Sequence, residues 1–437
     1  MMKQANLSRR HFLKQTAVLG ATAVAPSILP SSVFGAAARP SPSNRVTIGM
    51  VGVGGHGVAM NMRSFLANAD AQIVAVCDVD SDNCKKAQKI VNQRYGNEDC
   101  ATYGDFREVI ARKDIDAICV STPDHWHVPI SLMAIRAGKD VISEKPTLTI
   151  EEGRVLTETV KRHGAIFQTS TEDRGLPVYH RMAELVRNGR IGKLHTIRVG
   201  LPSGGGRDIP LERQQPEPVP TTLNYDMWLG PAPWAPYCAA RCHWNFRWNY
   251  DYSGGILTDW GMHIVDTAQW GNNTERTGPI MVEGRGEFPT SGIYNTATEC
   301  HLEYTYANGV KMFIETGGVG LRFEGADGWV GNTGWIGPLE ASSPRILTSS
   351  IGPEETHLYT CPAGEHRNFL DCVKSRRDPY FPAEIGHRCA SVQHIGNAAM
   401  LLGRKLRWNP EKEEFVNDDS ANRMRSRAMR APWTLQG

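Results

Sequence analysis

Apolar runs alternate with amphipathic stretches from residue 46 to about residue 171. Continuous apolar runs, typical of strands that are buried on both faces, occupy 46–53, 71–80, 115–123, 140–146 and 165–171. Helical spacing of apolar residues separates them, at 57–68, 81–96, 105–112, 127–138 and once more before 165–171. Strands that alternate with helices in this way predict an α/β domain with a doubly wound parallel sheet.

The pattern changes after a helix that we predict at 177–190. The stretches 193–201, 280–288, 298–306 and 310–317 alternate between apolar and polar residues, as in an antiparallel sheet with one face in water. Helical patterns return at 365–375 and 384–406. We therefore predict a dinucleotide-binding domain over 45–176. A second, α+β domain follows over 177–437, with a bridging helix at 177–192 and a large, open, mostly antiparallel sheet.

The first 38 residues differ in composition from the rest. They contain Lys3, Arg9, Arg10 and Lys14 and no acidic residue. An apolar run of about half the ~20 residues of a membrane span follows, and small residues end it. This order predicts a signal peptide cut near residue 38, a linker at 39–44, and a mature chain that does not span a membrane.

The order Ser-Arg-Arg-His-Phe-Leu-Lys at residues 8–14 resembles a twin-arginine signal, so we expect a periplasmic protein. A general secretory signal that happens to hold two arginines is the alternative. The net charge is +2 for the whole chain and −2 without the first 38 residues. A chain without a basic surplus is not expected to bind nucleic acid.

The chain has ten cysteines. Cys77 and Cys119 lie in apolar runs and are expected to be buried as small hydrophobic residues. Cys238 and Cys242 precede His243 and are open to a zinc site or a disulfide, but the spacing lacks a second pair of ligands. We expect unpaired or structural cysteines and no metal.

A glycine-rich turn follows the first predicted strand. Gly52, Gly54 and Gly57 form the G-x-G-x-x-G pattern, with Gly55 and His56 between them. In this pattern the glycines permit a tight turn, a close approach of a pyrophosphate and close helix packing, and the phosphates lie at a helix N-terminus. Asp78 ends the next strand, where a carboxylate binds ribose hydroxyls and repels a 2′-phosphate. The sequence therefore predicts NAD as cofactor, with NADP less favoured.

Two further groups carry candidate chemistry. Glu144 and Lys145 end the strand 140–146, at the edge where doubly wound sheets bind ligands, and an ammonium there can stabilise an alkoxide. Asp259 and His263 lie four residues apart on one predicted helix face, where the carboxylate can orient a histidine base. A surface lysine, a surface helix pair and a zinc site are the alternatives.

These motifs occur in one order along the chain. After the glycine-rich turn come Thr-Pro-Asp-His-Trp-His at 122–127, Glu-Lys-Pro at 144–146, Arg-Asn-Gly-Arg-Ile-Gly-Lys-Leu at 187–194, G-G-x-x-x-D-x-G-x-H at 254–263 and Gly-His-Arg at 386–388. From residue 45 onward the chain resembles the Gfo/Idh/MocA superfamily, which includes glucose–fructose oxidoreductase and inositol dehydrogenase. The resemblance implies a Rossmann domain joined to an open-sheet substrate domain.

The resemblance also implies roles for individual residues. Lys145 falls on the catalytic lysine of the family, and Asp259 and His263 fall on its Asp-x-x-x-His pair. The family's turn beside the cofactor falls on Thr122, Pro123 and His127, with Asp124 in place of the usual Asn. Arg174 matches a family arginine, although the Glu172 and Asp173 before it depart from the pattern. The predicted cofactor-binding residues are Gly52, Gly54, Gly55, His56, Gly57, Asp78, Thr122, Pro123, His127, Glu144 and Lys145.

Together these observations predict an exported oxidoreductase. His263 would take the hydroxyl proton, Lys145 would hold the same oxygen, and Asp259 would orient His263 or a second hydroxyl. Six of the eleven tryptophans fall between residues 228 and 270, within and just after the Gly-, Pro- and Trp-rich stretch 203–254, which has no strand pattern and suits loops that build a site. We expect about half of these tryptophans in the core. The predicted substrate is a sugar, glycoside or cyclitol, with His127, Arg174, Trp244 and Arg247 as substrate-binding residues.

Two other functions stay open from the sequence. Some relatives use bound NAD to cleave a glycoside through a transient ketosugar, although that branch tends to lack the lysine found here at position 145. The second alternative is a non-catalytic sugar sensor. The resemblance also leads us to expect a homo-oligomer formed through the open sheet.

Overall fold

A computed structural model describes residues 40–206 and 209–436 of the protein. The predicted signal peptide therefore lies outside the described residues. Contacts divide the chain into two units, Met1–Arg45 and Val46–Gly437. The described part of the first unit holds one short 3₁₀ turn, η2 (Pro42–Asn44). Both sheets and the candidate site belong to the second unit.

The predicted parallel sheet is confirmed. Six strands lie in the order β3-β2-β1-β4-β5-β6, and each neighbouring pair is parallel. This is the strand order of a Rossmann fold, with the turn after β1 at the point where the order reverses. The strands are β1 (Val46–Val51), β2 (Ala71–Cys77), β3 (Ala101–Tyr103), β4 (Ala117–Val120), β5 (Asp140–Glu144) and β6 (Phe167–Ser170).

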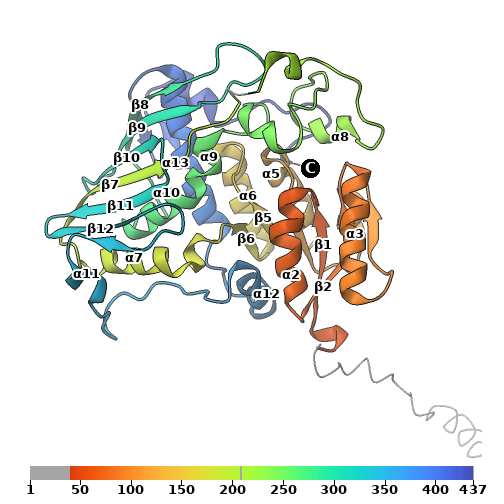
Figure 1. The fold of residues 1–437 in the computed structure, drawn as a ribbon, viewed down its shortest axis with the longest axis horizontal. Coiled ribbons are helices and arrows are strands. Elements are labelled where there is room, and N and C mark those ends of the chain that lie inside the picture. The colour runs from red at the N-terminus through yellow and green to blue at the C-terminus, as the bar shows by residue number, and fades with distance from the viewer. Residues whose placement is uncertain (1–39, 207–208, 437) are drawn as a thin grey trace, which may run out of the picture. The chain divides into compact units, whose positions relative to one another are not determined.

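Helices cover both faces of this sheet (Figure 1). The first begins as the π-helical segment η3 (Gly57–Met62) and continues as α2 (Arg63–Ala67). The side chains of Asp80, Asp105 and Thr149 cap three of the others by accepting hydrogen bonds from N–H groups of the first turn. The other helices of this half are α3 (Ser81–Tyr95), α4 (Phe106–Ala111), α5 (Asp124–Arg136) and α6 (Ile150–His163).

The second predicted sheet is also confirmed, and it is larger than the sequence pattern suggested. Nine strands lie in the order β13-β12-β11-β7-β10-β9-β8-β14-β15. Of the neighbouring pairs, only β7 and β10 are parallel in the described ranges. The strands are β7 (Leu194–Leu201), β8 (Met281–Glu287), β9 (Glu299–Thr305), β10 (Lys311–Thr316), β11 (Gly320–Gly325), β12 (Gly328–Thr333), β13 (Glu340–Ala341), β14 (Leu406–Asn409) and β15 (Glu414–Phe415).

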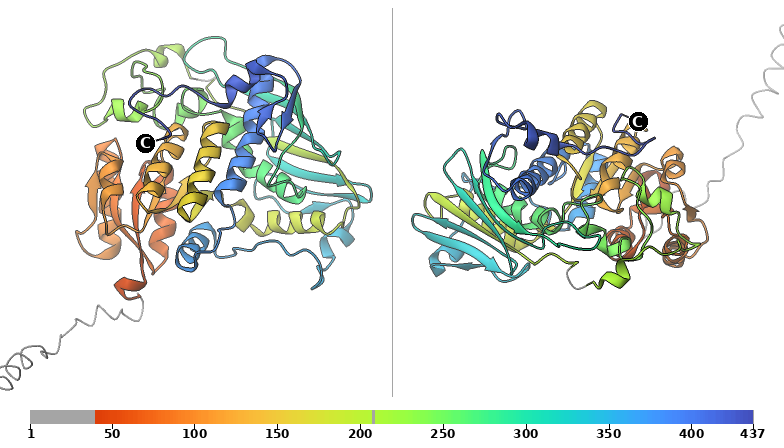
Figure 2. Two further views of the ribbon diagram at one scale, coloured as in Figure 1. Left: turned by 180° about the vertical axis from the view of Figure 1, so that it is seen from behind. Right: turned by 90° about the horizontal axis from the view of Figure 1, so that it is seen from above.

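Helices pack on one face of the nine-stranded sheet, as Figures 1 and 2 show. Residues of β9 alternate between buried and partly exposed, so the opposite face meets water. Three of the helices in contact with the sheet are α7 (Pro177–Arg187), α10 (Gly261–Gly271) and α13 (Ala383–Leu402), while α11 (Pro344–Thr348) and α14 (Asp419–Asn422) contact its outermost strands β13 and β15. The remaining helices and turns of this half are η4 (Asp173–Gly175), α12 (Glu365–Ser375) and η7 (Arg423–Arg425).

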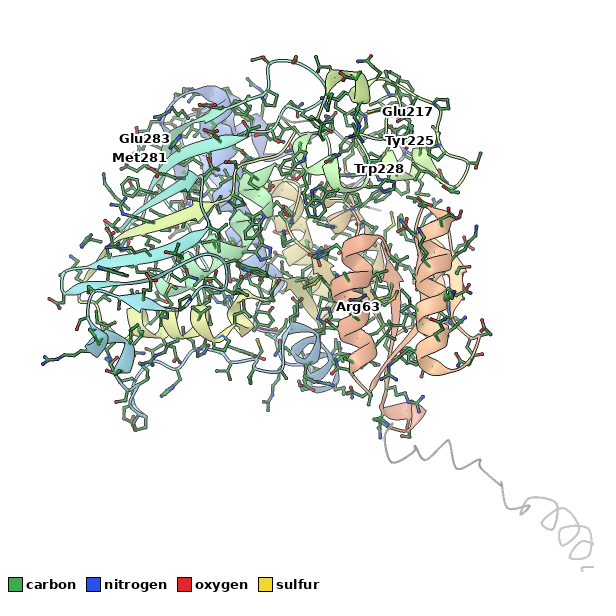
Figure 3. All side chains as sticks on the ribbon, viewed as in Figure 1. Arg63, Glu217, Tyr225, Trp228, Met281 and Glu283 are labelled. Atoms are coloured by element: carbon green, nitrogen blue, oxygen red, sulfur yellow. The ribbon has the colours of Figure 1, made fainter. Side chains whose placement is uncertain are left out.

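The stretch 203–254 forms loops and short helices, as predicted. In its described residues, 203–206 and 209–254, the one β contact is an isolated bridge between Leu223 and Asp80. Figure 3 labels Tyr225 and Trp228, which belong to α8 in this stretch, well away from Met281 and Glu283 on β8. The short helices here and just beyond are η5 (Leu211–Gln214), α8 (Tyr225–Leu229), η6 (His243–Trp248) and α9 (Ile256–Asp259).

Several smaller predictions can be compared with the structure. All ten cysteines lie in described residues, and each is buried and unpaired, Cys238 and Cys242 included. Trp228, Trp248 and Trp270 are buried, which confirms that half of the six clustered tryptophans belong to the core. In the described ranges, every helix is too short or too polar to cross a membrane. The domain boundary at residue 176 stays a prediction.

Candidate functional site

One cavity of about 820 Å³ collects almost all of the predicted site residues. It opens at the carboxyl ends of β1, β2, β4 and β5 and extends to the loops of 222–263, with Glu172 and Trp335 completing the wall. Its size falls in the usual range for small-molecule sites, about 300–1,000 Å³. The predicted residues that line it are Gly52, Gly54, Gly55, His56, Gly57, Asp78, Thr122, Pro123, His127, Glu144, Lys145, Trp244, Arg247, Asp259 and His263.

The glycine-rich turn has the geometry of a phosphate-binding loop. Gly52 has φ +85°, and a Cβ there would lie 2.6 Å from the backbone of Ser121, so this position requires glycine. A Cβ on Gly57 would lie 2.3 Å from the Gly52 carbonyl oxygen, which shows how tightly the helix packs on the strand.

The glycines between them face open space. A Cβ on Gly54 would meet its first protein atom, Asn83 Nδ2, at 3.7 Å, and a Cβ on Gly55 would meet nothing within 4 Å. Both residues line the cavity. The backbone of Gly54 and Gly55 is therefore exposed to the cavity. A pyrophosphate that approaches the helix N-terminus fits against this exposed backbone.

Asp78 is fixed at the rim of the same cavity. Its Oδ2 accepts a hydrogen bond from the Val53 N–H and its Oδ1 accepts one from the Asp80 N–H, each at 2.9 Å. Burial raises the pKa of Asp78, and these N–H groups oppose the rise. The Asn83 side chain also hydrogen-bonds this carboxylate, and its two oxygens together still have acceptor capacity for a ligand. Asp78 can therefore accept hydrogen bonds from ribose hydroxyls while it also holds the loop.

Lys145 and Asp259 form an ion pair across the cavity. Lys145 follows β5, and its Nζ donates to Asp259 Oδ1 at 2.6 Å and to the Asp259 carbonyl oxygen at 3.0 Å. Burial alone would lower the pKa of Lys145, but the charge and hydrogen bond of Asp259, together with the Glu144 charge, outweigh burial and raise it. Lys145 is thus an ammonium with three donors, two of which serve Asp259, so the third can meet a ligand oxygen.

Arg247 is the second cation at Asp259. Its Nε lies 3.3 Å from Asp259 Oδ2, close enough for an ion pair although not aligned as a hydrogen bond. Burial acts to raise the pKa of Asp259, but Lys145 and Arg247 hold it far below its usual range. The Arg247 guanidinium also lies 4.3 Å from the ring of the exposed Trp244. This aromatic and cationic corner is open to a substrate.

The predicted partner of His263 is wrong. Asp259 ends α9 and His263 lies in α10, so the single predicted helix is interrupted at Trp260. Both residues line the cavity, but His263 Nδ1 is bonded to Asp173 Oδ2 at 2.7 Å. Trp335 Nε1 donates to the other Asp173 oxygen at 2.8 Å. Asp259 instead forms an ion pair with Lys145, because a buried ammonium without a carboxylate partner costs more free energy than a buried neutral imidazole.

The Asp173–His263 pair sets the state of the imidazole. Burial lowers the pKa of His263, but the Asp173 charge and hydrogen bond outweigh burial and raise it above the ordinary value of 6.5. With Nδ1–H donating to Asp173, Nε2 is left to accept a proton. A hydroxyl group of a bound ligand could supply that proton only from the cavity, which His263 lines.

The predicted substrate contacts of Arg174 and His127 are wrong, because both side chains are bonded to other parts of the protein. Arg174 does not line the cavity: its guanidinium is buried and forms ion pairs with Asp266 at 2.7 Å and Glu275 at 2.8 Å. His127 does line the cavity, but its ring nitrogens contact the Pro146 and Thr122 carbonyl oxygens at 2.8 and 2.7 Å. Neither residue has a polar atom left for a sugar hydroxyl.

Other wall residues were missed by the sequence reasoning. Trp335 comes from a loop far along the chain, and no local pattern marks it. Glu172, next to Asp173, lies 4.0 Å from His263 Nδ1. Glu172, Asp173 and His263 are the one group in the described ranges whose side chains could together hold a metal ion. Asp173 and His263 already bind each other, and the absence of a metal stays a prediction.

Glu144 and His56 connect the two ends of the cavity. His56 Nε2 lies 2.9 Å from Glu144 Oε1, which also accepts from the buried Asn61 at 2.8 Å. Burial opposes the Glu144 charge, yet these contacts lower the pKa of Glu144 to about 2. The glycine-rich loop is thereby tied to the strand end that bears Lys145.

Two domains of one known protein family together match nearly the whole second unit. The NAD-binding Rossmann fold of the Gfo/Idh/MocA oxidoreductase family matches residues 46–171, and its C-terminal alpha/beta domain matches residues 186–435. The chain belongs to the Gfo/Idh/MocA oxidoreductase family. Membership confirms the resemblance drawn from the motifs, and the bare glycine loop described above agrees with NAD as the cofactor of this Gfo/Idh/MocA protein.

Curated relatives of this Gfo/Idh/MocA protein match it over a limited length. A glycosyl hydrolase family 109 protein of Saccharopolyspora erythraea is 33% identical over 173 residues, 36% of this chain and 37% of the relative. The alpha-N-acetylgalactosaminidase of Shewanella oneidensis is 30% identical over 173 residues, 36% of this chain and 38% of the relative. D-xylose 1-dehydrogenase (NADP(+)) of Hypocrea jecorina is 33% identical over 28% of this chain and 31% of the relative. The chain thus spans about a third of the length of these relatives.

Solved structures share the fold over a greater length. The aldose-aldose oxidoreductase from Caulobacter crescentus, complexed with glycerol, has a TM-score of 0.61 at 17% identity and covers 83% of this chain and 99% of its own. The WlbA dehydrogenase from Bordetella pertussis, in complex with NADH and UDP-GlcNAcA, has a TM-score of 0.63 at 15% identity, with 84% and 99% covered. At these identities the likeness establishes the fold of the Gfo/Idh/MocA protein alone.

Proposed function

We propose that this protein is an exported oxidoreductase that transfers hydride between tightly bound NAD and a hydroxyl of a sugar, glycoside or cyclitol. The observation that supports it best is the single cavity in which the glycine-rich loop and Asp78 occupy one end and Lys145 and His263 the other. When bound, NAD supplies the hydride acceptor for the carbinol carbon. The residues of the chain supply binding and proton transfer.

His263 is the proposed base and Lys145 the proposed oxyanion donor. Nε2 of His263 takes the hydroxyl proton, because Asp173 holds the hydrogen on Nδ1. The third Lys145 N–H donates to the same oxygen and stabilises the alkoxide as the proton leaves. Asp259 keeps Lys145 charged and holds its ammonium in place. In this proposal Asp259 orients Lys145 and not His263.

The walls near these groups support a sugar as substrate. Trp244, Trp260 and Trp335 offer apolar faces for the C–H faces of a sugar ring, and Arg247 and Glu172 offer hydrogen-bonding groups for its hydroxyls. The names of the relatives point the same way, since one is a xylose dehydrogenase and one an aldose oxidoreductase.

The test is the absorbance of the reduced nicotinamide. Purified mature protein, with its own NAD, is mixed with single sugars, glycosides and cyclitols, and a rise at the reduced-cofactor band is expected for one class. The Lys145→Ala variant, which should bind NAD but not react, is the matched control. No rise with any candidate would contradict the oxidoreductase proposal and leave a sugar sensor or an NAD-dependent glycosidase.

A second candidate is an NAD-dependent glycosidase, favoured by the similarity to glycosyl hydrolase family 109 proteins. The presence of Lys145 favours plain oxidation over this route. Product analysis separates the two: a ketosugar supports the oxidoreductase, and a free aglycone with no net change in NAD supports the glycosidase.

Export and assembly complete the proposal. A twin-arginine route moves folded proteins, so NAD bound in the cytoplasm can accompany the chain to the periplasm, where a second sugar or the product itself would take the hydride back. Denaturing periplasmic protein purified without added NAD should release about one dinucleotide per chain. We further propose a homo-oligomer through the water-facing side of the nine-stranded sheet, which the mass in solution tests.

A further inference from the structure

We propose that residues 222–228, here called the cover, enclose the adenosine half of NAD, and that residues 423–436, here called the strap, fasten the cover shut. The inference deepens the proposed function, since it rests on NAD as the resident cofactor and gives a physical reason for its slow release. Neither segment belongs to the Rossmann part that matches residues 46–171.

The cover forms a wall of the cavity opposite the end of β2. Leu223, Met227 and Trp228 line the same cavity as Asp78 and Phe106. In a Rossmann fold the residue at the position of Asp78 binds the adenosine ribose, so this part of the cavity is the adenosine half. A dinucleotide bound there would have protein on the side that faces away from the Rossmann sheet.

Main-chain hydrogen bonds join the cover to the loop after β2. The Ser81 N–H donates to the Thr222 carbonyl oxygen at 2.9 Å, and the Asn224 N–H donates to the Val79 carbonyl oxygen at 2.9 Å. These bonds flank the isolated bridge between Asp80 and Leu223. The cover is therefore paired with the segment that follows Asp78 and does not merely lie near it.

The other end of the cover is held by α5. Trp126 Nε1 donates to the Met227 carbonyl oxygen at 3.0 Å, and His125 Nε2 lies 2.9 Å from the Trp228 carbonyl oxygen. Gly230 has φ +49°, and a Cβ there would lie 2.1 Å from the Trp126 ring. The cover thus spans the cavity from the end of β2 to the start of α5.

The strap holds the cover from outside. Arg430 donates to Asp226 Oδ1 at 2.6 Å and to the Gly230 carbonyl oxygen at 2.9 Å. Trp433 packs its ring 4.7 Å from that of Trp126 and 6.2 Å from that of Phe106, both of which line the cavity. Arg430 and Trp433 do not line the cavity themselves.

These contacts predict how the cofactor leaves. Release of the adenosine half requires the cover to separate from the loop after β2 and from α5, a local opening that the strap opposes. Removing a strap contact should therefore speed release without changing any atom that a ligand touches. The nicotinamide half, bordered by Lys145 and His263, should be affected much less.

The experiment measures release of radiolabelled NAD from the holoenzyme after a chase with excess unlabelled NAD. Met227→Ala removes a cavity wall, and Trp433→Ala removes a strap contact. Each should raise the dissociation rate about tenfold or more and weaken ADP-ribose binding, with little effect on nicotinamide mononucleotide. Trp234→Ala is the matched control, because Trp234 lies in the same loop region, is 70% exposed and does not line the cavity.

The results can overturn the inference independently of the reaction. Wild-type rates of NAD and ADP-ribose release in folded Met227→Ala and Trp433→Ala proteins would overturn it, and so would an equal effect on nicotinamide mononucleotide. Thermal unfolding checks the fold, and Arg430→Met replaces Trp433→Ala if the latter does not fold. Because ADP-ribose cannot accept hydride, its binding tests the cover even if no sugar is oxidised.

Discussion

Replacing Asp173 with asparagine tests the pair that the structure assigns to His263. The substitution keeps the shape of the side chain and removes the charge that lies 2.7 Å from His263 Nδ1. A hydrogen bond to a charged group contributes about 1.5–3 kcal/mol. Since one pKa unit corresponds to about 1.4 kcal/mol, the pKa of His263 should fall by about 1–2 units.

The direction of the effect on activity follows from the role of the base. Sugar oxidation needs neutral His263, so the wild-type rate should rise with pH through a pKa above the ordinary 6.5. In Asp173→Asn the acidic limb of the profile should move to lower pH, with a lower plateau because the tautomer is less well fixed. Lys145 and Glu172 also act on His263, with opposite signs, and both remain in the variant.

The assay is the pH dependence of kcat/KM, followed by the absorbance of reduced nicotinamide between about pH 5 and pH 9. Glu172→Gln is the control: its carboxylate lies 4.0 Å from the same nitrogen without a hydrogen bond, so the limb should move less. An unchanged acidic limb in a folded Asp173→Asn protein would refute the pairing of Asp173 with His263 as the basis of catalysis.

Three further substitutions test other parts of the site. Lys145→Ala should lower turnover by about 10²–10⁴-fold while NAD titrations stay near the wild type, and near-normal turnover would remove it from the chemistry. Asp78→Ala should weaken NAD binding and relax discrimination against NADP. If the substitution changes neither the NAD affinity nor the NADP affinity, Asp78 does not bind the ribose. Arg174→Met should lower the free energy of unfolding by about 3–5 kcal/mol in denaturant titrations, because Asp266 is left buried without its partner, whereas a stable variant with a raised KM would restore Arg174 as a substrate contact.

The parallel sheet and the glycine-rich turn could be predicted because their signals are local. Buried runs and the spacing of Gly52, Gly54 and Gly57 reflect packing and backbone limits that act within a few residues. The short strand β3 was missed because three residues, none of them fully buried, give no periodic signal. Strands β11 and β12 were missed because glycines at their ends or within them leave only a short alternation of apolar residues, and β13 was missed because it has two residues.

The sequence predicted most of the residues that line the cavity, but not which side chains pair with one another. The i, i+4 spacing of Asp259 and His263 correctly placed both on the cavity, yet each found its partner on another element, at Lys145 and Asp173. Arg174 was assigned to the substrate from a motif, whereas its buried surroundings supply two carboxylates. Such pairings depend on tertiary distances and on the need of buried charges for partners, and a single sequence shows neither.

The placement of β7 has a consequence for how the chain folds. β7 lies between β10 and β11, and it pairs in parallel with a strand that begins at Lys311. The nine-stranded sheet therefore has a high contact order at its centre and cannot close before residues beyond 311 are available, which slows folding. The six strands of the parallel sheet all lie within 46–170 and can pair without later residues, while Phe369 and Leu370 of α12 complete the core beside them afterwards. We expect refolding in two kinetic phases, the earlier one forming the nucleotide-binding half.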